Sequence, residues 1–225
     1  MAGGSPPHKE FSVIDLHNYM LAVGIGNIAF AVLILVYMRS STASAGLRTW
    51  MLARTVFGLT QLLAWARPQA GLPLLVAVES AGWVIGLTLE AAAYMRFFGY
   101  FRLQRRLVPA AGLGLLLAWA SPLAGMAYED LVAYVSLLLG GGAFTIGCLL
   151  VRSRLPDATD LQRLIGVTDI ICGATLIHFA WLGILGLPVS DGNMLTGYVA
   201  GYLLLIVNGF GFGGQNAVAV LRAIQ

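Results

Sequence analysis

The sequence predicts an all-α membrane protein of seven transmembrane helices, built as two three-helix repeats joined by an extra helix (3+1+3). The chain of 225 residues is 59% hydrophobic and only 10% charged, with a mean hydropathy of +0.83. Its apolar stretches are long enough to cross about 30 Å of hydrocarbon at about 1.5 Å per residue. They lack the alternation of membrane strands, so helices are the economical way to satisfy backbone groups in lipid.

The repeat comes from matching the chain against itself without a gap, which places Asp15 on Asp130, a shift of 115 positions. About 20 of roughly 85 aligned residues are identical, against about 7 expected by chance from this composition. The identical pairs include Tyr19 and Tyr134, Arg39 and Arg154, Arg48 and Arg163, Gly58 and Gly173, Thr60 and Thr175, and Gly71-Leu72-Pro73 with Gly186-Leu187-Pro188. We therefore expect parallel repeats at residues 15–102 and 130–217, related by a pseudo-two-fold axis along the membrane normal.

The individual elements follow from the apolar runs and the breakers between them. Seven spans are expected, at residues 17–38, 47–66, 73–98, 107–124, 131–152, 163–186 and 195–218. Residues 1–14 form an outer tail, and the linker 103–129 recrosses the membrane so that both repeats keep one orientation. Arg67-Pro68-Gln69 and Ser121-Pro122 are expected in loops. Residues 218–225 are expected to begin a cytoplasmic signalling helix whose output domain is absent.

Arginine is distributed unevenly between alternate loops. One side collects Arg39, Arg48, Arg54, Arg96, Arg102, Arg105, Arg106, Arg152, Arg154, Arg163 and Arg222. The other side has only Lys9 and Arg67. The positive-inside rule therefore predicts an outer N-terminus and a cytoplasmic C-terminus. We expect the chain to lie in the cell inner membrane. The net charge of +3 then reflects loops near anionic lipid and not a nucleic-acid surface.

Polar residues within the spans form two layers by depth. Ionisable side chains in hydrocarbon cost about 2.5–3.5 kcal/mol on insertion scales, so each needs a partner or a function. The inner layer contains Arg54, Glu90, Asp169, Asn208 and Gln215. Arg54 aligns with Asp169 in the repeat, which predicts an ion pair across the axis or separate pairs such as Arg54 with Glu90. A structural pair that fixes helix register is the simpler interpretation, ahead of a transport role.

The outer layer is rich in aromatic residues and contains His17, Gln61, Trp65, Arg67, Glu79, Trp83, His178, Trp181, Tyr198 and Tyr202. Such residues often only anchor a protein at the membrane interface. A pocket lined by aromatics with a few polar groups is also the usual form of a small-ligand site. The candidate ligand contacts are Glu79, Trp83, His178, Trp181 and Tyr202.

Several cofactors and activities can be weighed from the same residues. A retinal Schiff base needs an intramembrane lysine, and the single lysine is Lys9 in the tail. His17 and His178 are weak candidates for ligands of a b-type haem, whereas a zinc site would need more ligands. A membrane hydrolase would need a clustered His/Asp/Ser set or a three-His metal set, which the sequence does not contain.

Two functions remain, a sensor and a small-solute transporter. The sensor is favoured by a final span weakened by glycines, which would move and carry a signal inward. The transporter is favoured by the 3+1+3 duplication. Against transport, the first, third, fifth and seventh spans contain no proline that would act as a hinge, except Pro73 at the end of the third. The packing motif Gly82-xxx-Gly86 and its copy Gly197-xxx-Gly201 suit either function.

Residues 50–100 also carry a family resemblance. The series Trp50, Gly58, Leu62-Leu63, Arg67-Pro68, Leu72-Pro73, Glu79, Gly86 and Phe97-Phe98-Gly99 resembles the membrane-sensor regions that precede GGDEF diguanylate cyclase domains in bacteria. The remainder of the chain matches only in topology. The resemblance implies an input module without catalysis of its own, which regulates a cytoplasmic cyclase for cyclic di-GMP and is often a homodimer. The chain lacks the Gly-Gly-Asp/Glu-Glu-Phe signature, and no binding residues can be carried over from the family.

Overall fold

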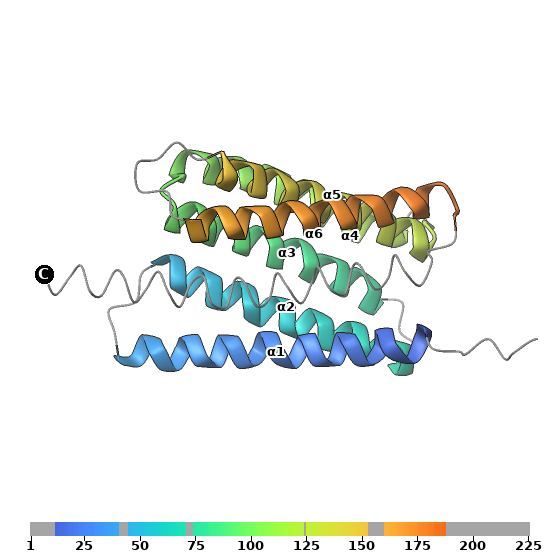
Figure 1. The fold of residues 1–225 in the computed structure, drawn as a ribbon. Coiled ribbons are helices and arrows are strands. Elements are labelled where there is room, and N and C mark those ends of the chain that lie inside the picture. Colours follow the sequence, from blue (N-terminus) through green and yellow to red (C-terminus); the bar gives the residue numbers. More distant parts are fainter. Residues whose placement is uncertain (1–11, 41–44, 71–73, 124, 153–159, 188–225) are drawn as a thin grey trace, which may run out of the picture.

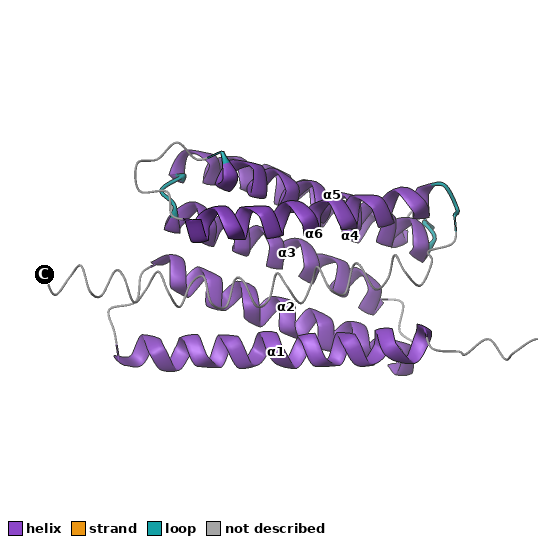
Figure 2. Ribbon diagram, in the orientation of Figure 1, coloured by secondary structure: helices purple, strands orange, loops and turns teal. Residues whose placement is uncertain are grey.

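A computed structural model describes residues 12–40, 45–70, 74–123, 125–152 and 160–187 of the chain. These residues form six helices, α1 (Ser12–Ser40), α2 (Ala45–Ala70), α3 (Leu74–Phe97), α4 (Phe101–Leu123), α5 (Tyr128–Val151) and α6 (Asp160–Ile184). Figure 2 shows that the remainder of the described chain forms turns and loops without strands. The all-α prediction is therefore confirmed for this part of the chain. The predicted span at 195–218, with Asn208, Gln215, Tyr198 and Tyr202, lies outside the described residues.

Four of the described helices are long and apolar enough to cross a membrane. The candidate spans are Asn18–Arg39, Leu74–Phe97, Asp130–Val151 and Gln162–Ile184, in α1, α3, α5 and α6. Helix α4 has a shorter apolar stretch, Val108–Ala120. Helix α2 carries three arginines, Arg48, Arg54 and Arg67, along its length. The described fold is thus that of a membrane-embedded helical protein, whereas the seven spans and their orientation stay predictions.

The side chains are distributed as expected for a protein surrounded by lipid. Large apolar residues such as Leu33, Leu116 and Leu164 are exposed on the helix surfaces. The buried polar side chains are those of Asn27, Thr49, Arg54, Thr60, Gln61, Ser80, Glu90, Gln162, Thr168 and Asp169. Hydrocarbon accepts the outward leucines, but it cannot hydrogen-bond the polar groups, which therefore face the interior of the bundle.

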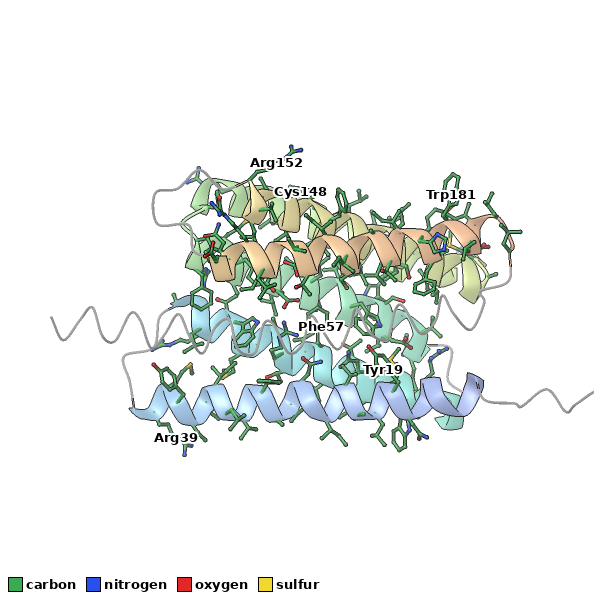
Figure 3. All side chains as sticks on the ribbon, viewed as in Figure 1. Tyr19, Arg39, Phe57, Cys148, Arg152 and Trp181 are labelled. Carbon is green, nitrogen blue, oxygen red and sulfur yellow. The ribbon has the colours of Figure 1, made fainter. Side chains whose placement is uncertain are left out.

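Helix α3 lies at the centre of the packing. It contacts α2, which packs on α1, and it also contacts α4 and α5 (Figure 1). Among the described helices, α6 packs on α5 alone. A hydrophobic cluster nevertheless links α1, α2 and α3 with α5 and α6. It consists of Ile34, Leu47, Trp50, Ala91, Ala93, Tyr94, Phe98, Ile146, Leu150 and Ile165. Figure 3 shows Arg39 near one end of the bundle and Trp181 near the other.

Helices α5 and α6 approach each other at backbone distance through glycines. A Cβ atom added to Gly147 would lie 2.5 Å from the carbonyl oxygen of Gly166. A Cβ atom added to Gly173 would lie 2.6 Å from the carbonyl oxygen of Gly140. Two antiparallel helices therefore meet at two glycine pairs, with about two helical turns between them. Small residues allow this approach and the van der Waals contact that drives helix association in lipid.

The aligned glycines of the two repeats have the same local role. Gly58 on α2 is the repeat partner of Gly173, and its added Cβ would lie 2.7 Å from Ile28 and 3.0 Å from the carbonyl oxygen of Gly24 on α1. In each repeat this glycine stands where the second helix crosses the first. The agreement supports the duplication, while the superposition of whole repeats stays a prediction.

The predicted packing role of Gly82 and Gly86 is confirmed. Both glycines lie on α3 and face α2, where an added Cβ atom would overlap the side chain of Thr60 at Gly82 and that of Phe57 at Gly86. Helices α2 and α3 therefore pack closely along this face. The matching glycines Gly197 and Gly201 lie outside the described residues.

The expected loops at Arg67-Pro68-Gln69 and Ser121-Pro122 were wrong. These residues lie in the last turns of α2 and α4, which end at Ala70 and Leu123. A proline removes only its own N–H and obstructs the carbonyl four residues before it. Near a helix end this costs one hydrogen bond, so each helix ends just after its proline instead of before it.

Helix α6 ends at a glycine that its geometry requires. Gly186 has φ of 63°, a left-handed conformation that glycine adopts without strain. The N–H of Leu187 donates to the carbonyl of Leu182, and that of Gly186 donates to the carbonyl of Gly183, both at 3.0 Å. These bonds satisfy carbonyls that the helix end would otherwise leave without partners.

Replacing Gly173 by alanine is expected to lower the free energy of unfolding by about 3 kcal/mol, because the new methyl group would overlap the backbone of α5. Gly58→Ala should cost less, since its nearest obstacle is the rotatable side chain of Ile28. Gly141→Ala is the matched control on α5, where an added Cβ has no atom within 4 Å. It should raise stability by up to about 1 kcal/mol through helix propensity.

Unfolding of the purified chain in mixed detergent micelles measures all three changes. A Gly58→Ala variant that is less stable than Gly173→Ala would contradict the assignment of the closest backbone contact to α5 and α6.

Candidate functional site

A buried polar network joins α1, α2 and α3 in the interior of the bundle. We define it by five side chains, Asn27, Arg54, Gln61, Glu90 and Tyr94. Its centre is the ion pair between Nη2 of Arg54 on α2 and Oε1 of Glu90 on α3. These side chains are only 5% and 7% exposed. The pair therefore places two opposite charges inside the apolar bundle, where water cannot solvate either one.

Asn27 connects the ion pair to α1. Its Oδ1 accepts a hydrogen bond of 3.2 Å from Nη1 of Arg54, and its Nδ2 donates to Oε1 of Gln61 at 2.8 Å. The same Nδ2 donates to the backbone carbonyl of Val23 at 3.2 Å. The amide thus uses both its donor and its acceptor side, which fixes α1 against α2 in one register.

Two aromatic residues complete the surroundings of the charges. The hydroxyl of Tyr94 donates to Oε1 of Glu90 at 3.2 Å, one helical turn away on α3. The guanidinium of Arg54 lies 5.3 Å from the centre of the Trp50 ring, within the range of a cation–π contact. Both aromatics belong to the hydrophobic cluster, so the network is continuous with the packed core.

Asp169 on α6 faces this network without completing it. Its side chain is buried, with the residue 4% exposed, and it interacts electrostatically with Glu90 and Arg54. Within the described part of the chain, Oδ2 of Asp169 has no hydrogen-bond partner, and neither has Nε of Arg54. One cation therefore faces two carboxylates, and it still has one unused donor.

The inner layer predicted from the sequence is brought together in part. Of the two alternative pairings, the structure has Arg54 with Glu90. Asp169 lies beside this pair, and the described residues contain no ion pair between Arg54 and Asp169. Asn208 lies outside the described residues. The coupling role of these residues stays a prediction.

Sequence reasoning did not assign Asn27, Tyr94 or Trp50 to a site, and it named Trp50 only as part of the family resemblance. Asn27 had a recognisable signal, because it is the only strongly polar side chain between Met20 and Val36. A lone amide in an apolar span requires a partner in another helix. Tyr94 and Trp50 gave no such signal, since aromatic residues are ordinary constituents of an apolar core.

Glu79 and Trp83 lie at the other end of the α2–α3 interface. Oε2 of Glu79 is 2.8 Å from Nε of Arg67, with side chains 12% and 23% exposed, respectively. Trp83 also hydrogen-bonds to Glu79, and its ring centre is 5.8 Å from that of Phe57. These contacts give both residues a structural role between α2 and α3.

His178 and Trp181 are exposed on α6, with Trp181 57% exposed. The described contacts of α6 are with α5, so the structure does not bring His178 and Trp181 together with Glu79 and Trp83. Tyr202, the fifth predicted contact, lies outside the described residues. The predicted ligand pocket therefore stays a prediction.

The described residues offer no cluster of three or more His, Cys, Asp or Glu side chains that could hold a metal ion. His17 lies in α1, but its side chain is outside the described part of the structure. His178 is exposed, and its ring is tilted by 43° to that of the next residue, Phe179, with ring centres 6.3 Å apart. Haem ligation by these two histidines stays a prediction.

Comparisons with known proteins found no relative of this chain. No protein-family model matches the chain, and no curated protein or solved structure matches it. The functional argument therefore rests on the buried polar network and on Asp169.

Arg54→Ala is expected to lower the free energy of unfolding by about 3–5 kcal/mol, because it leaves the buried Glu90 without its cation. Adding Glu90→Gln should recover part of this loss, since the amide carries no charge. Unfolding in detergent micelles of the two single variants and the double variant gives the coupling energy.

Arg67 and Glu79 provide the matched control pair at the other end of the same interface. Their partial exposure predicts a coupling of about 1 kcal/mol or less. Additive effects of Arg54→Ala and Glu90→Gln would contradict the central role assigned to the Arg54–Glu90 pair.

Proposed function

We propose that the chain is a transmembrane sensory module that relays an external or membrane-borne signal through its last helix to a cytoplasmic output domain. The output domain is a diguanylate cyclase, in line with the resemblance of residues 50–100. The observation that carries the proposal is the unequal charge of the network taken together with Asp169, because Arg54 lies near two carboxylates and pairs with one.

This arrangement provides the two states that a sensor needs. In the described state Arg54 pairs with Glu90, and the unused atoms are Nε of Arg54 and Oδ2 of Asp169. In a second state Arg54 pairs with Asp169 and releases Glu90. Both states keep the cation neutralised, so they can differ by a small free energy that a signal is able to reverse.

An exchange of partners would move α6 relative to α2 and α3. Asp169 and Ile165 are four residues apart and therefore share one face of α6. Ile165 is fully buried in the hydrophobic cluster with Trp50 and Tyr94. Drawing Asp169 toward Arg54 would therefore repack this cluster, at the end of the bundle where Arg39 lies. In the proposed orientation that end faces the cytoplasm.

The proposed setting follows the distribution of arginines. The module lies in the bacterial inner membrane, with seven spans, an outer N-terminus and a cytoplasmic C-terminus, and it acts as a homodimer. A small ligand would bind at the outer end, with Glu79, Trp83, His178, Trp181 and Tyr202 as contacts. The ion pair of Arg67 with Glu79 would link such a ligand to α2.

A small-solute transporter is the second candidate, favoured by the sequence duplication and by carboxylates inside the membrane. Uptake by proteoliposomes of a panel of sugars, amino acids and nucleosides tests it. Saturable uptake that Arg54→Ala abolishes would support transport and weigh against the sensory proposal.

The sensory proposal is tested by fusing the full chain, through Gln225, to a diguanylate cyclase catalytic domain in lipid nanodiscs. Glu90→Gln should favour pairing of Arg54 with Asp169, whereas Asp169→Asn should hold Arg54 on Glu90. The two variants are expected to change cyclic di-GMP production in opposite directions, by about 5-fold or more.

Asp130→Asn is the control, because Asp130 is an exposed acidic residue at the start of α5. It should leave the cyclase rate unchanged. Equal rates for the parent fusion, Glu90→Gln and Asp169→Asn would rule out signalling through this network.

A further inference from the structure

The charges around Asp169 do not balance. Arg54 supplies one positive charge, and the ion pair with Glu90 uses it. Asp169 supplies a second carboxylate in the same buried region, and its Oδ2 has no hydrogen-bond donor in the described part of the chain. With both carboxylates ionised, the region would hold a net charge of −1 inside an apolar bundle. Such a charge is very costly unless a positive charge binds to it.

Among the described residues, the surroundings of Asp169 supply no second cation. From α2 it faces Arg54, and from α3 it faces Glu90 and Tyr94. Its neighbour on α6 is Cys172, an uncharged thiol. On α5, the glycine contacts place Ile146 and Gly147 level with Asp169, because a Cβ added to Gly147 would meet the backbone of Gly166 and Ile170 on α6. The charged residues of α5, Glu129, Asp130 and Arg152, lie at or beyond its two ends. The nearest of them, Arg152, is exposed and lies about 8–9 Å from that level along the helix axis, at about 1.5 Å per residue.

We infer that Asp169 is a proton-binding site, and that the ligand of the network is a single proton taken from the aqueous phase. The Asp169 carboxylate accepts this proton and becomes a neutral carboxylic acid, so the region balances with the Arg54–Glu90 pair. When the proton leaves Asp169, the new carboxylate competes with Glu90 for Arg54. Proton occupancy thus sets which of the two carboxylates Arg54 contacts.

A proton suits this position better than an alkali cation does. An alkali cation needs several oxygen ligands around it, and the guanidinium of Arg54 beside Asp169 would repel it. A proton needs one oxygen atom and no cavity. It also leaves a carboxylic acid of the same shape, so binding does not disturb the close contacts between α5 and α6.

This inference deepens the proposed sensory function by naming the proton as the occupant of the network, but its test does not depend on signalling. The full chain is reconstituted in lipid, and infrared spectra are recorded at neutral pH with and without carbon-13 in the aspartate side chains. We expect a carboxylic-acid carbonyl band that shifts on aspartate labelling. Exposed aspartates are ionised at this pH and contribute only carboxylate bands.

Two substitutions test whether Asp169 is the aspartate that carries the proton. Asp169→Asn should remove the labelled acid band completely, and Asp130→Asn should leave it unchanged. A wild-type protein without a labelled acid band, or a band that survives in Asp169→Asn, would overturn the inference. So would an acid band that disappears when sodium replaces choline in the buffer at constant pH, because the occupant would then be a metal cation.

Stability supplies a second measurement if the Asn variant alters the spectrum by unfolding. The folded chain holds a proton that the unfolded chain releases at neutral pH, so the resistance to unfolding should fall as pH rises. Asp169→Asn should reduce this slope, and Asp130→Asn should retain it. Equal slopes would overturn the inference. A failed cyclase assay with a labelled acid band present would reject the sensory function and leave the proton site standing.

Discussion

The neutralisation of Arg54 by Glu90 is the interaction on which the arrangement of α1, α2 and α3 depends. Arginine side chains stay protonated in proteins, so a buried guanidinium must have an anion beside it. Glu90 on α3 provides the anion and fixes α3 along α2. Asn27 then binds the same guanidinium from α1. One charge therefore sets the positions of three helices, and the close glycine contacts at Gly82 and Gly86 follow the register that it imposes.

The second half of the described bundle is held by a different kind of contact. Helices α5 and α6 meet through glycines at backbone distance, a contact of van der Waals type. The described ion pair in this half, Arg163 with Asp160, is exposed at the start of α6. Helices α5 and α6 therefore form one closely packed pair. Asp169 is the side chain through which this pair faces the charges of the first half.

The sequence was sufficient for the positions of the described helices, because hydropathy reports directly which segments can lie in hydrocarbon. The helix ends were predicted less well, because α2 and α4 continue past Pro68 and Pro122 and end one or two residues later. Arg54 and Glu90 were recognisable as intramembrane charges, but the choice between Glu90 and Asp169 depends on which helices are neighbours. The pocket expected from Glu79 and His178 needed the part of α3 around Glu79 to lie against the part of α6 around His178, and residue types contain no information on that adjacency.

The two repeats cannot be chemically equal at their centre. Arg54 and Asp169 occupy the same aligned position, and a faithful copy would place either two arginines or two aspartates in the bundle. Two like charges in apolar surroundings would repel each other and leave at least one without compensation. The amide that binds Arg54 is not repeated either, because Asn27 aligns with Gly142. A Cβ atom added to Gly142 would lie 2.8 Å from the Leu87 side chain on α3. Opposite charges at the aligned position remove the repulsion between the halves, and Glu90 then adds a second carboxylate, so that one cation faces two anions.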